Sequence, residues 1–240
     1  KKIKDFKNYL KEESLLKRLK AEEKKIINKI KKQNLTYLSK LKLANIIYTI
    51  DSVNKLKNKG ILVEAGCALG GSSILISSKK NISSKFLIFD VFSVIPPPTK
   101  KDPSDVHQRY KTIIDGKSTG LGDDLYYGYE DNLYKKVIDN LNSFGINIKD
   151  QNIHLVKGLV QDTMNICEPV AFAHIDVDWY EPVKTCLNQI WPNLVKGGCI
   201  ILDDYHDWGG CRKATDEYFA NFNRQFVMDD SFGSMKVTKL

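Results

Sequence analysis

Several features that would place this chain in a membrane or outside the cell are missing from its sequence. No apolar run approaches the roughly 20 residues of a membrane-spanning helix. No charged-then-apolar secretory signal opens the 240 residues. The five cysteines lack metal-type spacing, and their odd number argues against a disulfide framework. We therefore expect a reduced, cytoplasmic protein with no membrane partner.

Positive charge is scarce around the acidic motifs in the second half of the chain. Of the 37 Lys and Arg and 29 Asp and Glu, 18 and 6 fall in residues 1–60, which leaves 19 and 23 for the rest. The net charge of +8 therefore belongs to the N-terminal segment. Because phosphate contacts cluster around the cleft of a nucleic-acid enzyme, this distribution disfavours a nucleic-acid partner.

The basic N-terminal segment has a helical pattern. Apolar residues recur at helical spacing over residues 3–33, with lysines mainly on the other face, and a second amphipathic helix is expected over residues 36–53. Three interpretations stay open for the lysine face: solvent exposure, a lid or dimer helix, and binding of an anionic surface. We expect a helical extension over residues 1–58 before an α/β domain over residues 59–240.

A short apolar strand over residues 60–64 leads into a glycine turn and a helix over residues 72–77. This arrangement is typical of nucleotide-cofactor sites, but the turn reads Glu64-x-Gly66-x-x-x-Gly70-Gly71 and not the dinucleotide G-x-G-x-x-G. Glu64 would repel a pyrophosphate and attract a cationic ligand. A structural tight turn remains an alternative. Asp90 ends the next strand, residues 85–89, where it would accept hydrogen bonds from ribose hydroxyls or be solvated.

The long connection over residues 92–129 carries three consecutive prolines, several glycines and five polar aromatic residues, namely His107, Tyr110, Tyr126, Tyr127 and Tyr129. A connection of this length in a compact domain is usually a functional lid or disordered, and the tyrosines favour a lid. After a helix over residues 130–144 and a strand over residues 152–156, Gly158 precedes Gln161 and Asp162. This pair would meet the edge of an adenine, or Asp162 would be a helix N-cap.

Two apolar strands, residues 170–175 and 199–202, each end in a pair of acids, Asp176 with Asp178 and Asp203 with Asp204. Ligands bind at the carboxyl ends of strands in open α/β sheets. Four carboxylates at two neighbouring strand tips repel one another unless a cation or unusual protonation intervenes. Helices are expected over residues 181–191 and 210–221, and two last strands over residues 225–228 and 236–240. The chain would then have seven strands in a doubly wound sheet with an antiparallel hairpin edge.

Taken in order, these motifs resemble the macrocin O-methyltransferase family, the tylosin and mycinamicin sugar methyltransferases, over residues 60–220. The motifs are Glu64-Ala-Gly66 with Gly70-Gly71, Asp90-Val-Phe with Pro96-Pro97-Pro98, Gly158 with Gln161-Asp162-Thr163, Asp176-x-Asp178-x-Tyr180-Glu181, and Gly197-Gly198 with Asp203-Asp204-Tyr205. The resemblance implies the class I methyltransferase (Rossmann-like) fold with strand order 3-2-1-4-5-7-6, S-adenosylmethionine and Mg²⁺ or another hard divalent cation as cofactors, and a homo-oligomer. It implies a hydroxyl acceptor on a sugar or glycosylated natural product. A peptide or polyketide hydroxyl stays open, as do a nicotinamide-dependent oxidoreductase and a nucleic-acid methyltransferase.

The resemblance also assigns site residues. Asp176, Asp203 and Asp204 would hold the metal. The cofactor site would comprise Glu64, Gly66, Gly70, Ser72, Asp90, Gln161, Asp162 and Asp176. The methyl group would pass in line to a hydroxyl whose pKa the metal lowers, and a carboxylate would take the proton. Asp176 is the first candidate for that base, with Asp178 and His206 as alternatives, because Trp179 stands where the catechol methyltransferases have a lysine.

Overall fold

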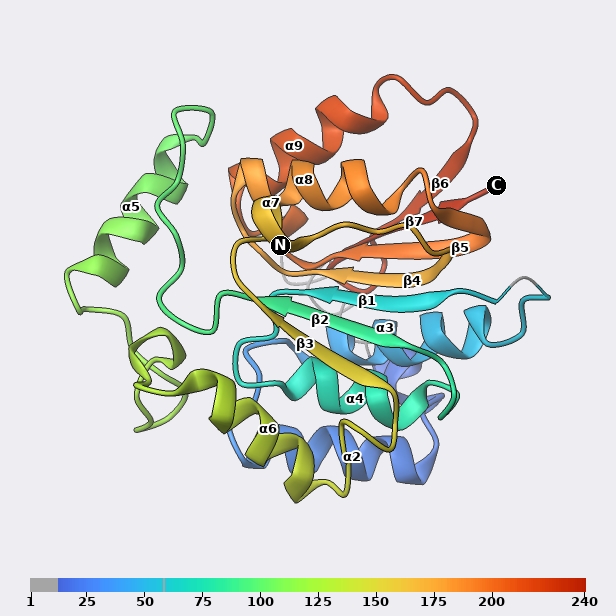
Figure 1. The fold of residues 1–240 in the computed structure, drawn as a ribbon, viewed down its shortest axis with the longest axis horizontal. Helices are drawn as coiled ribbons and strands as arrows, with labels where there is room; N and C mark the ends of the chain where they lie inside the picture. Colours follow the sequence, from blue (N-terminus) through green and yellow to red (C-terminus); the bar gives the residue numbers. More distant parts are fainter. Residues whose placement is uncertain (1–12, 58) are drawn as a thin grey trace.

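The computed structural model describes residues 13–57 and 59–240, and its centre is one seven-stranded sheet (Figure 1). The strands are β1 (Ile61–Ala65), β2 (Phe86–Asp90), β3 (Ile153–Lys157), β4 (Val170–Ile175), β5 (Leu194–Leu202), β6 (Phe226–Asp229) and β7 (Met235–Lys239). Their order is β3-β2-β1-β4-β5-β7-β6, as the resemblance predicted. β1 to β5 are parallel, and β7 pairs antiparallel with both β5 and β6, which confirms the predicted hairpin edge.

Helices cover both faces of the sheet (Figure 1). One face carries α2 (Ala21–Lys32), α3 (Lys40–Val53), α4 (Gly71–Lys79) and α6 (Leu133–Ser143), and the other carries α7 (Val160–Thr163), α8 (Tyr180–Ile190) and α9 (Gly209–Phe219). The central strand β4 is buried along its whole length, and its side chains divide between the two cores: Phe172 faces the first layer, while Ala173 and Ile175 face the second. Such complete burial is why this strand reads as an unbroken apolar run.

The N-terminal helical pattern is interrupted in the structure. Of the helix expected over residues 3–33, residues 3–12 lie outside the described residues, and the remainder breaks at residues 18–20. Lys20 adopts an extended backbone, and its N–H donates to Glu23 Oε2 at 2.8 Å, which starts a new helix, α2, instead of continuing the first. The second helix begins at Lys40, four residues later than expected, because Ser39 caps it.

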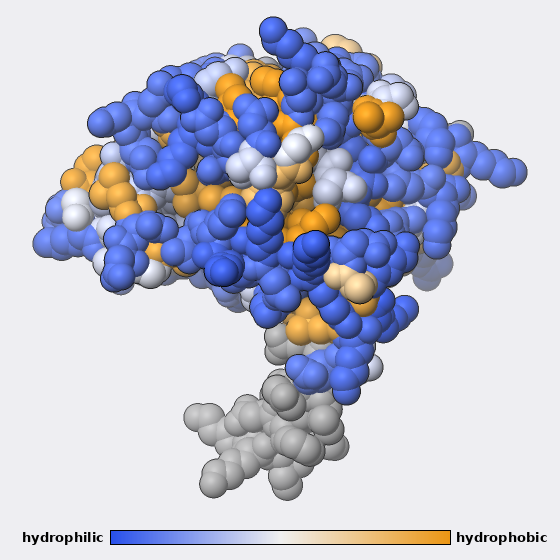
Figure 2. Space-filling model, turned by 90° about the horizontal axis from the view of Figure 1, so that it is seen from below, coloured by the Kyte–Doolittle hydropathy of each residue, from blue (hydrophilic) through white to orange (hydrophobic). Residues whose placement is uncertain are grey.

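Helix α3 is part of the main core although the sequence places it in the N-terminal extension. Leu43, Ile46, Ile47 and Ile50 are almost completely buried in the core that also contains Phe172 of β4. The two segments proposed on either side of residue 58 therefore share one hydrophobic core. The view from below, onto α2 and α6, shows a mainly hydrophilic surface with small hydrophobic patches (Figure 2). No helix in residues 13–57 or 59–240 is long and apolar enough to cross a membrane.

The connection over residues 92–129 contains a helix that the sequence pattern did not predict, α5 (Ser104–Ile114). Only Val106 and Ile113 of α5 are buried, so the apolar stripe is too narrow to stand out in the sequence. The connection lies beyond the carboxyl ends of the parallel strands, to the left in Figure 1. Tyr127–Tyr129 forms a short 3₁₀ helix, η1, at its end.

Candidate functional site

A cavity of about 660 Å³ lies at the carboxyl ends of the parallel strands. Its floor is made by the turns that follow β1 to β5. Its walls come from residues 35–42 of the N-terminal segment and from the connection over residues 92–129. Eight predicted site residues line it: Gly66, Ser72, Asp90, Gln161, Asp176, Asp178, Asp203 and Asp204. The prediction that the site would form at strand ends is therefore consistent with the geometry.

The glycine turn after β1 exists because two strand ends come very close. Gly66 has φ +82°, and a Cβ at this position would lie 1.9 Å from the carbonyl oxygen of Asp176. Only glycine allows β1 and β4 to approach in this way. Gly70, at φ +84°, is the N-cap of α4 and lies outside the cavity lining, where a Cβ would meet Val137. The alternative interpretation, a tight turn that needs glycine for backbone geometry alone, thus accounts for both Gly66 and Gly70.

Glu64 does not face the cavity. Its side chain is fully buried and receives hydrogen bonds from the hydroxyl of Ser73 and from Nδ1 of His174, the latter at 3.1 Å. Although burial acts against a charged imidazole, the bond to Glu64 raises the pKa of His174. The expected direct attraction between Glu64 and a cationic ligand is not supported by this placement, because the carboxylate is already used inside the sheet. The sequence offered no signal for the partnership, since His174 lies 110 residues away.

Asp90 organises the glycine turn. Its Oδ2 accepts hydrogen bonds from the backbone N–H groups of Cys67 at 2.7 Å and Ala68 at 3.3 Å, and its Oδ1 accepts from Phe92 N–H at 2.7 Å. Burial nevertheless raises the pKa of Asp90. A carboxylate has about four acceptor positions, so these three bonds leave one for a ligand hydroxyl. Asp90 therefore holds the turn and also borders the cavity.

The pair after β3 divides between cavity and solvent. Gln161 lines the cavity, whereas Asp162 is exposed and outside the lining. The N-cap of α7 is Leu159, so the alternative that Asp162 caps this helix is wrong. Of the two residues, only Gln161 is placed to meet a bound cofactor.

The acidic residues form a compact cluster between β4 and β5. Carboxylate oxygens of Asp176, Asp178 and Asp204 lie within 4.8 Å of one another, and so do those of Asp203, Asp204 and Asp207. The backbone N–H of Asp178, a residue held at φ +57°, donates to Asp204 Oδ2 at 3.1 Å. The cluster thus contains the four predicted acids and one, Asp207, that the sequence reasoning missed.

Crowding changes the acidity of these groups. Burial, together with the charge of Asp203, raises the pKa of Asp176 to about 8. Burial raises the pKa of Asp178 to about 6. Burial and the charges of Asp178 and Asp176 raise the pKa of Asp204 well above its usual range. Without a bound cation, the carboxyls of Asp176 and Asp204 therefore tend to hold a proton near neutral pH.

Lys42 is the second functional residue that the sequence did not reveal. Its Nζ lies 2.9 Å from Asp203 Oδ2 and 2.7 Å from Asp207 Oδ2. In the sequence it is one lysine among many in a basic segment. The tertiary fold alone brings it to the acids, which follow it by about 160 residues.

His206 lies outside the cavity lining. Its Nε2 is 3.3 Å from Asp230 Oδ2, and its side chain is 38% exposed. This placement gives no support to the prediction that His206 acts on the substrate. Tyr180 and Lys184 have the Tyr-x-x-x-Lys spacing of some nicotinamide-dependent reductases, but Tyr180 is also outside the lining, and its hydroxyl donates to Glu217 at 2.5 Å.

Aromatic side chains form part of the cavity wall. Tyr37 packs edge-on against Tyr127 at 5.9 Å, and Trp179 against Trp208 at 6.1 Å. The Trp179 indole N–H donates to the carbonyl oxygen of Pro96 at 2.9 Å, which ties the proline run to the site. The connection over residues 92–129 therefore borders the cavity, as a lid would.

Comparison with known proteins identifies the family. The family model described as macrocin-O-methyltransferase (TylF) matches residues 3–229. Demethyldecarbamoylnovobiocin O-methyltransferase from Streptomyces niveus is 32% identical over 76 residues, which cover 31% of this chain and only 29% of that enzyme.

Solved structures show the same fold. The O-methyltransferase NovP superimposes with a TM-score of 0.68 at 22% identity, covering 85% of this chain and 81% of that one. The calicheamicin methyltransferase CalS11 gives a TM-score of 0.60 at 15% identity, covering 98% and 92%. The family match removes the nicotinamide-dependent alternative. The chain belongs to the macrocin O-methyltransferase family.

Proposed function

We propose that this enzyme transfers the methyl group of S-adenosylmethionine to a hydroxyl of a sugar or sugar-bearing natural product, with the help of Mg²⁺ or another hard divalent cation. The observation that carries the proposal is the acidic cluster in the floor of the cavity, directly beside the glycine turn. Asp176 links the two features, because its backbone oxygen contacts Gly66 and its carboxylate belongs to the cluster.

The cluster has the chemistry of a hard-cation site. Mg²⁺ prefers carboxylate oxygens and retains waters that a substrate hydroxyl can replace. Asp176 and Asp204 would hold the ion, together with the Asp203 Oδ1 that Lys42 does not use. The raised pKa values of Asp176 and Asp204 support this role, since a divalent charge would relieve the repulsion that makes the carboxyls hold protons. When bound, the ion would lower the pKa of an acceptor hydroxyl.

The cofactor would occupy the side of the cavity formed by the glycine turn. Asp90 has one acceptor position for a ribose hydroxyl, Gln161 borders the space where an adenine would lie, and Ser72 sits in the first turn of α4. The missing dinucleotide motif agrees with this, because S-adenosylmethionine has no pyrophosphate to bind. The predicted cofactor roles of Glu64, Gly70 and Asp162 lack support from the geometry, and we leave these three residues out of the proposed cofactor site.

Asp178 is the better candidate for the general base. Its pKa of about 6 leaves it ionised at neutral pH yet basic enough to take a proton, which is the range in which general bases work best. Asp176, the first candidate from the sequence, is less suited because a carboxylate that binds a divalent cation loses basicity. His206 is not among the residues that line the cavity, and its ring pairs with Asp230 instead.

The acceptor would lie against the aromatic walls. Sugar rings present C–H faces to aromatic side chains while their hydroxyls reach polar groups. The names of similar proteins point the same way: one is named demethyldecarbamoylnovobiocin O-methyltransferase, and CalS11 is also described as a TDP-rhamnose 3'-O-methyltransferase. We further propose that the enzyme is a cytoplasmic homo-oligomer. The connection over residues 92–129 would act as a lid, and the N-terminal helices would form a lid or the oligomer interface.

Two variants test the proposal. Asp178→Asn should lower methyl transfer about 10²–10⁴-fold, the usual contribution of a general base. Asp204→Asn should abolish the Mg²⁺-dependent methyl transfer. Both should bind S-adenosylhomocysteine within several-fold of the wild type by calorimetry. Asp150→Asn, which removes an exposed carboxylate far from the cavity, is the matched control. Full activity of Asp204→Asn in EDTA would rule out the metal-assisted mechanism.

A further inference from the structure

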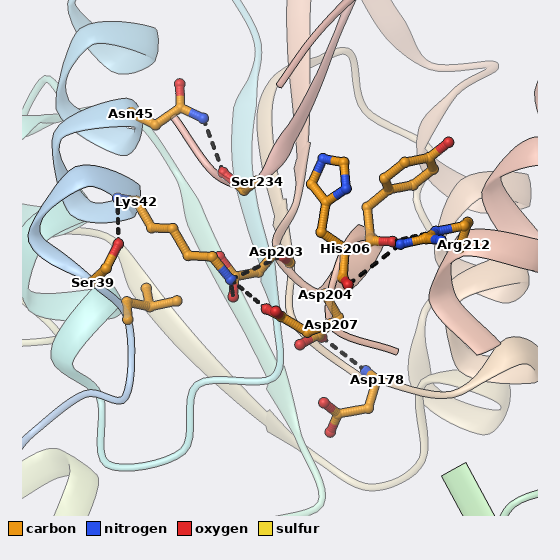
Figure 3. Close-up of polar contacts among 12 residues, drawn as sticks. Ser39, Lys42, Asn45, Asp178, Asp203, Asp204, His206, Asp207, Arg212 and Ser234 are labelled. Carbon is orange, nitrogen blue, oxygen red and sulfur yellow. Dashed lines mark hydrogen bonds and ion pairs between the residues drawn. The ribbon is translucent and has the colours of Figure 1, made fainter. Parts of the chain in front are cut away.

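The acidic cluster already contains one cation, and that cation is part of the chain. Lys42 Nζ donates to three oxygens: Asp203 Oδ2 at 2.9 Å, the Asp203 carbonyl at 3.1 Å, and Asp207 Oδ2 at 2.7 Å (Figure 3). An ammonium group has three protons, so these partners use its whole donor capacity. The lysine therefore sits in a complete coordination shell and not in a casual surface pair.

The position of Lys42 is fixed by the helix that carries it. Ser39 caps α3 and accepts a hydrogen bond from Lys42 N–H at 3.1 Å, which sets the first turn. Further along, Asn45 donates to Ser234 at 3.0 Å in a buried contact between α3 and the loop before β7 (Figure 3). The side chains of Lys42 and Asp203 are only 15% and 6% exposed. Rigid placement and partial burial make this pair stronger than an ordinary surface salt bridge.

The cluster consists of two overlapping groups. The inner group is Asp176, Asp178 and Asp204, and the outer group is Asp203, Asp204 and Asp207. Carboxylates shared in this way are the arrangement found where two divalent ions sit about 3.5–4 Å apart. Here the outer group holds the lysine ammonium, which is the place that a second ion would take.

We propose that Lys42 is a built-in counter-ion that occupies the Asp203–Asp207 side of the cluster, so that the cluster binds a single divalent ion, on the side of Asp176 and Asp204. This inference extends the proposed metal site, and the binding of the single ion rests on the proposed function. The physical reason is that the ammonium uses one carboxylate oxygen of Asp203 and one of Asp207, and repels a second divalent charge at close range. Five carboxylates without this lysine would have charge and oxygen ligands for two ions.

The test counts Mn²⁺ sites on the purified full chain. Free Mn²⁺ is measured by room-temperature electron paramagnetic resonance during titration of the metal alone at pH 8. Lys42→Met, which keeps the length and the helix propensity of the side chain, should gain one Mn²⁺ site relative to the wild type. Lys42→Arg, which keeps the charge, should gain none. Lys40→Met removes a charge from an exposed position of the same helix and controls for long-range electrostatics; it should gain none.

The outcomes separate this inference from the proposed function. One site in the wild type and two in Lys42→Met support both. One site in both proteins, with Lys42→Met folded by circular dichroism, overturns the role of Lys42 and leaves the metal site standing. No site in the wild type and one in Lys42→Met overturns the metal-dependent function and supports the blocking role. An equal gain in Lys40→Met overturns the inference, because any lost charge would then suffice.

Discussion

The metal-free enzyme should become less stable as the pH rises from about 4 to 8. The pKa of Asp176 is about 8 and that of Asp178 about 6 in the folded protein, against an ordinary value of 3.8. Between these values the folded state binds protons that the unfolded state has released, so stability falls with increasing pH. The raised pKa values of Asp204 and His174 act in the same direction.

The size of the effect can be estimated between pH 6 and pH 8. Asp178 is about half ionised at pH 6 and almost fully ionised by pH 8, so its contribution over this interval is small. Asp176 still holds its proton in the folded state at pH 6 and has released it in about half of the molecules at pH 8. One raised pKa contributes about 1.4 kcal/mol per pH unit, less as the pH approaches the folded value. Asp176 alone therefore lowers the free energy of unfolding by about 2 kcal/mol, or about 4–8 °C in Tm for a domain of this size.

Differential scanning calorimetry in EDTA at pH 6, 7 and 8 measures this trend. Asp176→Asn, which removes the titrating group, should flatten it, and Mg²⁺ at about 100 times its Kd should restore about 2.7 kcal/mol to the wild type at pH 8. A wild-type Tm that stays level or rises between pH 6 and pH 8 would refute the reasoning. So would an equally steep fall in Asp176→Asn.

Two further substitutions probe the turn that brings cofactor and acids together. Gly66→Ala places a Cβ 1.9 Å from a backbone oxygen, so thermal denaturation should show a loss above 4 kcal/mol or no folded protein. Gly116→Ala, at φ +71° with open space around it, should lose only about 1 kcal/mol, and equal losses would contradict the close-approach argument. Asp90→Ala leaves three backbone N–H groups without their acceptor, so calorimetry should show at least tenfold weaker S-adenosylhomocysteine binding, while Asp90→Asn should keep part of it. Unchanged affinity in Asp90→Ala would show that the turn does not depend on this residue.

The sheet and the place of the site were readable from the sequence because both depend on local patterns. A strand buried on both faces is a continuous apolar run, and the acid that follows it marks the point where the strand leaves the core. Asp176 and Asp203 were identified in this way. Parallel strands then bring such ends together at one edge of the sheet without further information.

Long-range contacts were not readable. Lys42 and Glu64 have partners more than 100 residues away, and nothing in their neighbours distinguishes a lysine that enters the site from one in solvent. Glu64 was misplaced for a related reason. Its position at a strand tip suggested contact with a ligand, but the alternation of side chains along β1 puts its carboxylate on the face of the sheet beside His174 and Ser73 of α4. Helix α5 escaped notice because two buried residues do not make a detectable stripe.

The most direct test of the account is a crystal structure with S-adenosylhomocysteine and Mn²⁺, in which anomalous scattering locates the metal. We expect a peak at coordination distance from both Asp176 and Asp204, with the cofactor ribose at Asp90. The peak should lie on the inner side of the cluster, away from the Lys42 ammonium. A structure with the cofactor bound and no anomalous peak near either aspartate would contradict the central claim.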